Sequence, residues 1–162
     1  LHDAAAALER LPQRVAALVL DFYWVVTDNQ VLTLQDGTEA VVANRGDGMG
    51  IEMLKATGVV VAVMSKERNP VVAARCAKLQ IEAIQGLDEK VETLRSWCVG
   101  NDIDLDDVVF VGNDLNDQAC LRAAGCGAVV ADAHPSVLGD ADLVLSAKGG
   151  HGAVREICDL II

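Results

Sequence analysis

Polar side chains with catalytic potential follow four apolar runs in this sequence. Asp21 comes near the end of the run ALVLDF, Ser65 ends VVVAVMS, Lys90 follows IEAIQG, and the oxygen-rich turn GNDLND (112–117) follows DVVFV. A carboxylate can act as a nucleophile, a hydroxyl and a lysine can bind an anion, and carboxylate and amide oxygens can hold a hard cation. Each residue alone could equally be a helix cap or a solvated side chain, so their common placement after apolar runs is the informative feature.

The elements that must position these residues alternate between strand and helix. Candidate strands lie at 17–22, 59–65, 81–86, 107–114, 126–132 and 142–146, and the first of them is a continuous apolar run of buried-strand length. Segments with helical spacing or caps lie between and after them, at 50–58, 71–80, 87–102, 115–125, 134–141 and 152–162. Asp36-Gly37 marks the turn of a hairpin over residues 30–43.

This order predicts an α/β fold with a doubly wound parallel sheet, Rossmann-like, with a β-hairpin insertion. In such sheets the ligand crevice lies at the carboxyl ends of the strands. That rule places Asp21, Ser65, Gly86 and the turn 112–117 close together.

Length and composition set limits on the class of protein. The 162 residues predict a single domain over 1–162, in which Pro12 and the segment 1–14 read as a possible linker from an upstream domain. A net charge of −11 argues against binding to nucleic acid or to anionic membranes. The five cysteines form no C-x-x-C pair, and no apolar run has transmembrane length, which predicts buried thiols and a cytoplasmic location.

The four positions together resemble the motifs of the haloacid dehalogenase (HAD) superfamily of phosphatases. The similarity extends to its capless branch, which contains 3-deoxy-D-manno-octulosonate 8-phosphate phosphatases and the phosphatase-like domain of acylneuraminate cytidylyltransferases. It is carried by TDNQV before a hairpin, by RGDGMGI (45–51), by VVADAHP (129–135) and by KGGHGAVREI (148–157). Together these motifs cover nearly the whole chain.

The resemblance implies a mechanism with an aspartyl-phosphate intermediate. Asp21 would be the nucleophile, Ser65 and Lys90 would bind the phosphate, and Thr27 and Asp28 would hold the loop. Mg²⁺ would be the cofactor. In the family its protein ligands are the nucleophile, the backbone carbonyl two residues later and the first acidic residue of the last motif; here these positions are Asp21, the Tyr23 oxygen and Asn113, with Asp114 and Asp117 as partial compensation.

Three positions depart from the family pattern D-x-D-G-x-x-T-D and its acidic last motif. Tyr23 stands at the position of the acid-base aspartate, Trp24 at that of a glycine, and Asn113 at that of a metal-binding aspartate. A tyrosine with an ordinary pKa near 10 can donate a hydrogen bond but cannot act as a base at neutral pH. Loss of the aspartate would cost roughly 10²–10⁴ in rate.

Two functions therefore stay open at this point. One is a weakened phosphomonoesterase for a small acidic sugar phosphate of the ulosonate or sialic-acid type, in which the hairpin 30–43 helps to build a homotetramer and Lys148, His151 and Arg155 contact the anion. The other is a catalytically degenerate domain that oligomerises or regulates a fused or associated sialic-acid cytidylyltransferase. Whether Tyr23 and Trp24 are natural or engineered is a third question that the residues leave open.

Overall fold

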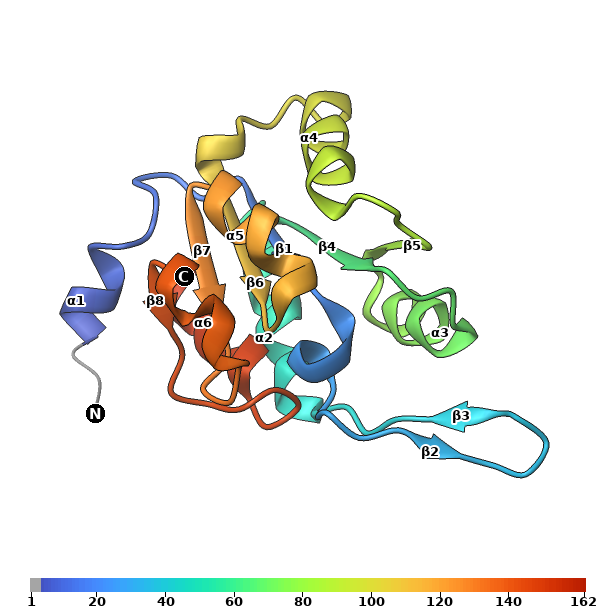
Figure 1. Cartoon of the computed structure of the whole chain (residues 1–162). Helices are drawn as coiled ribbons and strands as arrows, with labels where there is room; N and C mark the ends of the chain where they lie inside the picture. Colours follow the sequence, from blue (N-terminus) through green and yellow to red (C-terminus); the bar gives the residue numbers. More distant parts are fainter. Residues whose placement is uncertain (1–3) are drawn as a thin grey trace.

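The computed structural model describes residues 4–162, and its centre is a six-stranded parallel sheet (Figure 1). The spatial order is β5-β4-β1-β6-β7-β8. The strands run over Glu82–Gln85 (β5), Val60–Ser65 (β4), Ala17–Leu20 (β1), Val108–Gly112 (β6), Cys126–Val129 (β7) and Leu143–Val144 (β8). All pairings are parallel. The predicted doubly wound α/β fold is thus confirmed.

The helices cover both faces of the sheet. On one face α2 (Arg45–Ala56) packs against α6 (Ala153–Ile161) and α3 (Pro70–Leu79), and on the other α4 (Lys90–Gly100) packs against α5 (Gln118–Ala123). The chain adds β4 and β5 on one side of β1, and β6, β7 and β8 on the other. Because each crossover is right-handed, the crossover helices of the two halves lie on opposite faces of the sheet. The central strands β1, β4 and β6 are almost entirely buried, because helices cover them from both sides.

Helix α2 begins at Arg45, five residues before the predicted start at residue 50. The Asn44 side chain caps it by accepting a hydrogen bond from the Gly46 backbone N–H (2.7 Å). A Cβ at Gly50 would lie 3.2 Å from the Arg155 Cα, so glycine allows α2 to approach α6 closely. The sequence prediction was wrong here because glycines lower helix propensity, whereas tertiary packing determines this start.

The hairpin predicted over residues 30–43 is present and projects away from the rest of the chain (Figure 1). Its strands are β2 (Leu32–Thr33) and β3 (Glu39–Ala40), paired antiparallel, and the Asp36 side chain accepts a hydrogen bond from the Thr38 backbone N–H (2.9 Å) at the turn. Several of its apolar side chains are solvent-exposed: Val31, Leu32, Leu34 and Val42.

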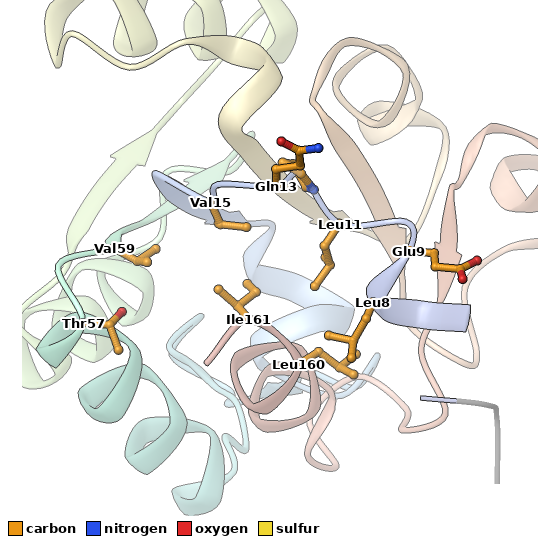
Figure 2. A pocket seen from close by; sticks show the side chains of 10 residues that line it. Leu8, Glu9, Leu11, Gln13, Val15, Thr57, Val59, Leu160 and Ile161 are labelled. Atoms are coloured by element: carbon orange, nitrogen blue, oxygen red, sulfur yellow. The ribbon is translucent and has the colours of Figure 1, made fainter. Parts of the chain in front are cut away.

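The first described segment packs against the domain. After α1 (Ala4–Leu8), Leu11 and Val15 lie against the core, and they face Leu160 and Ile161 of α6 across a hollow of about 550 Å³ (Figure 2). This hollow lies before the start of β1, at the amino ends of the strands. Leu11 and Val15 thus contact the domain, residues 1–3 of the predicted linker 1–14 lie outside the described residues, and the linker stays a prediction. No helix in residues 4–162 is long and apolar enough to cross a membrane.

Candidate functional site

Asp21 lies directly after β1, at the carboxyl edge of the sheet. Its backbone N–H donates to the Val111 carbonyl of β6 (2.9 Å), which continues the sheet pairing by one residue and fixes the start of the following loop. The residue is only 5% exposed. An ionised carboxylate buried to this extent needs charged or hydrogen-bonding partners.

Lys90 supplies one of these partners. Its Nζ donates to Asp21 Oδ1 (2.9 Å) and to Asp117 Oδ1 (2.6 Å), and all three side chains are buried. Burial disfavours the charged lysine, but the two carboxylates outweigh it and raise the Lys90 pKa. Burial and the charge of Asp21 raise the pKa of Asp117, against the effect of Lys90. The lysine is a fixed cation beside the candidate nucleophile.

Asn113 supplies the other partner of Asp21. Its side-chain Nδ2 donates to Asp21 Oδ2 (2.9 Å) and to the Tyr23 backbone carbonyl (2.8 Å), and its backbone N–H donates to Asp117 Oδ2 (2.9 Å). Both oxygens of Asp117 are therefore engaged, by Lys90 and by the backbone of Asn113. The carboxylate of Asp117 acts here as the support that holds these two residues.

Trp24 has the backbone conformation expected of the glycine it replaces. Its φ and ψ are 61° and 15°, the left-handed region, which costs a residue with a Cβ about 1–2 kcal/mol. The chain at Gly149 packs so closely that a Cβ there would lie 2.1 Å from the Trp24 carbonyl oxygen. The Trp24 Nε1 is buried without a hydrogen-bond partner.

Tyr23 is held beside Asp21 and remains protonated. Its ring makes an edge contact with Phe22 (centroids 5.1 Å apart), and its hydroxyl is buried without a hydrogen-bond partner. Burial, followed by the charges of Glu67 and Glu39, raises the Tyr23 pKa. The phenol can therefore donate a proton or a hydrogen bond, but it cannot take a proton from water at neutral pH.

A hollow of about 440 Å³ opens over Asp21. Five of the predicted site residues line it, namely Asp21, Tyr23, Ser65, Asn113 and Asp114, together with Trp24, which stands at the position of the family's glycine. Four residues that sequence reasoning missed line it as well: Asn29, Lys66, Glu67 and Asn116. Lys66 follows Ser65 directly, so its position after the end of β4 was the signal that could have identified it as a cation near a bound phosphate.

Lys148, His151 and Arg155 do not line this hollow. Lys148 and His151 are exposed, and the Arg155 side chain pairs with Asp159 of its own helix (2.8 Å). Their predicted role in contacting an anion requires a neighbouring subunit, which leaves it a prediction.

The donor set at this site has the spacing that Mg²⁺ requires but little negative charge. Six-coordinate Mg²⁺ has ligands at about 2.1 Å, so adjacent ligands lie about 3.0 Å apart. The Asn113 amide atom lies 2.9 Å from Asp21 Oδ2 and 2.8 Å from the Tyr23 oxygen, which is this spacing. The three residues fit the ion once the amide presents its oxygen instead of its nitrogen. Only one of the three ligands is charged, and residues 4–162 contain no cluster of three His, Cys, Asp or Glu side chains suited to a metal.

The fold and this site define a class of protein. A family model for haloacid dehalogenase-like hydrolases matches residues 75–157, and the chain belongs to that family. Its members include phosphatases, which are hydrolases of phosphate esters.

Individual relatives narrow the class. The chain is 33% identical over 151 residues to the 3-deoxy-D-manno-octulosonate 8-phosphate phosphatase of Escherichia coli, covering 93% of this chain and 80% of the relative. An HAD family hydrolase structure from Streptomyces avermitilis has a TM-score of 0.90 at 43% identity (93% and 87% covered). The Moraxella catarrhalis octulosonate phosphatase, solved with magnesium, phosphate and its KDO molecule, has a TM-score of 0.92 at 28% identity (99% and 91% covered). The chain is an HAD-type phosphatase related to these enzymes.

Proposed function

We propose that this chain acts on a small acidic sugar phosphate of the ulosonate or sialic-acid type, through an aspartyl-phosphate on Asp21. The observation that carries this proposal is the position of Asp21 at the hollow, held by Lys90 on one oxygen and by Asn113 on the other. Both contacts orient the carboxylate, and each of its oxygens keeps a lone pair for attack on phosphorus.

The roles of the residues follow from these contacts. Asp21 attacks phosphorus and displaces the sugar alkoxide, which takes a proton from water while the Tyr23 phenol, still protonated, donates a hydrogen bond to it. Lys90 compensates the negative charge at Asp21, while Ser65 and Lys66, both lining the hollow, bind phosphoryl oxygens. Mg²⁺ held by Asp21, the Tyr23 oxygen and Asn113 would neutralise further charge on the phosphate.

Hydrolysis of the aspartyl-phosphate is the step that this site performs poorly. It requires a base to activate water, and the raised pKa of Tyr23 keeps the phenol protonated. We therefore expect slow turnover, with the covalent intermediate formed faster than it is cleaved.

Phosphate release from a panel of sugar phosphates in the presence of Mg²⁺ tests this function. Activity that disappears in Asp21→Asn supports the assignment, and a Tyr23→Asp/Trp24→Gly double variant should be roughly 10²–10⁴ times faster. If the double variant is active and the unsubstituted chain shows neither turnover nor aspartyl-phosphate, the enzymatic proposal fails for this chain. Absence of activity in both would reject the proposed substrate class.

A second candidate function is that of an oligomerisation or regulatory domain, favoured by the projecting hairpin with its exposed apolar side chains. We propose that the hairpin contributes to a homotetramer and that the chain is fused to or associates with a cytidylyltransferase. Light scattering would show a mass that falls to that of smaller species in Leu32→Asp/Val42→Asp, with Thr38→Asp at the turn as control. An unchanged mass would reject the hairpin's role.

The five buried free cysteines support a cytoplasmic location.

A further inference from the structure

The Asn113 amide links the two segments that a metal would link. One segment is the loop after β1, represented by the Asp21 carboxylate and the Tyr23 carbonyl, and the other is the loop after β6, which carries Asn113. Asn113 is 4% exposed, so these hydrogen bonds are shielded from water.

The partners determine which amide atom faces them. A carboxylate oxygen and a carbonyl oxygen can only accept hydrogen bonds, so the amide must present its NH₂ group to both. The same two oxygens are the ones that would coordinate Mg²⁺. The NH₂ group and the cation therefore compete for the same pair of acceptors.

We propose that the Asn113 NH₂ group is a built-in replacement for the divalent cation, which keeps the site assembled without metal and makes Mg²⁺ binding weak. To bind the ion, the amide must turn by about half a turn and give up both hydrogen bonds. The ligand set then carries a single negative charge instead of two, which weakens it further. This inference rests on the proposed function only in its assignment of the metal position.

Asn113→Asp tests the idea, because it replaces the donor by the carboxylate that a metal prefers. Without metal it places two carboxylates about 3 Å apart, and with metal it completes the ligand set. Asn116→Asp is the matched control, since Asn116 lines the same hollow and is exposed. Melting temperatures in EDTA and in 1 and 10 mM MgCl₂, together with calorimetric titration by MgCl₂ alone, provide readouts independent of activity.

The unsubstituted chain should melt at the same temperature in EDTA and in MgCl₂ to within about 1–2 °C. Asn113→Asp should melt at least about 4 °C lower in EDTA, recover in MgCl₂, and bind Mg²⁺ at least tenfold more tightly. Asn116→Asp should behave as the unsubstituted chain.

Two results would overturn the proposal. One is an unsubstituted chain that gains as much stability from MgCl₂ as Asn113→Asp does. The other is Asn113→Ala melting in EDTA at the temperature of the unsubstituted chain, because the NH₂ group would then stabilise nothing. Neither result depends on phosphatase activity, so a failure of the proposed reaction is distinguishable from a failure of this inference.

Discussion

Replacing Trp24 by glycine and by alanine measures the backbone strain that the indole residue accepts. Both variants lose the indole, so the lost packing cancels in their difference. At φ = 61° alanine pays about 1–2 kcal/mol for the left-handed conformation, and glycine pays almost nothing. The greater freedom of glycine in the unfolded chain returns about 0.4–1 kcal/mol to alanine. We therefore expect Trp24→Gly to be the more stable variant by about 1 kcal/mol.

Urea unfolding of the two variants provides the measurement, and the difference corresponds to about 2–4 °C in melting temperature for a chain of this size. The same pair at Ser96, an exposed position in the middle of α4, is the control. There alanine should be more stable than glycine by about 1 kcal/mol. If alanine is also the better residue at position 24, the left-handed backbone is not maintained in solution and the reasoning is refuted.

Three further perturbations have definite expected outcomes. Lys90→Met should destabilise the chain by about 3–5 kcal/mol in urea unfolding, because it leaves two buried carboxylates unpaired, whereas the exposed Lys66→Met should have an effect near zero. Burial raises the pKa of Asp47 to about 6, so the folded state binds that proton more tightly than the unfolded state does, and this contribution to stability is present below about pH 4 and lost by pH 6. Asp47→Asn keeps an oxygen for the Arg155 backbone N–H. In this variant the decrease in the free energy of unfolding between pH 4 and pH 7 should be smaller by about 1–3 kcal/mol. Tyr23→Phe removes a buried hydroxyl without a partner, so it should leave stability unchanged or raise it by about 1 kcal/mol, whereas a loss above 1 kcal/mol would indicate a hydrogen bond in solution.

The strands and the site edge could be predicted from the sequence because both follow from local patterns. A strand that is apolar on both faces must be buried on both faces, as in a parallel sheet covered by helices, and the run that precedes Asp21 is an example. Once the sheet is parallel, the carboxyl ends of β1, β4 and β6 must meet at one edge. Asp21, Ser65 and Asn113 therefore line one hollow, as expected.

The features that the sequence could not predict depend on contacts between distant segments. The sequence identifies an asparagine at position 113, but only the two acceptors on the β1 loop determine that its nitrogen faces them. Arg155 reads as an anion-binding residue, yet Asp159 one helical turn later engages its side chain. The start of α2 at Arg45 has one local signal, the capping residue Asn44, but the glycines that follow it are held in the helix by packing against α6.

The departures at positions 23 and 113 affect one structural unit and cannot be treated as independent losses. Asn113 contacts the backbone of Tyr23 at 2.8 Å and the proposed nucleophile Asp21 at 2.9 Å, and groups in direct contact usually show coupling energies of about 0.5–3 kcal/mol. Tyr23→Asp alone would place a third carboxylate near Asp21 and Asp117 with no added cation, whereas together with Asn113→Asp the ligand set can bind Mg²⁺ tightly enough to offset that charge. The increase in turnover from both substitutions should therefore exceed the product of the two separate increases. If the two increases simply multiply, the metal position and the acid-base position are not coupled, and the amide of Asn113 is a local contact with no influence on the chemistry at residue 23.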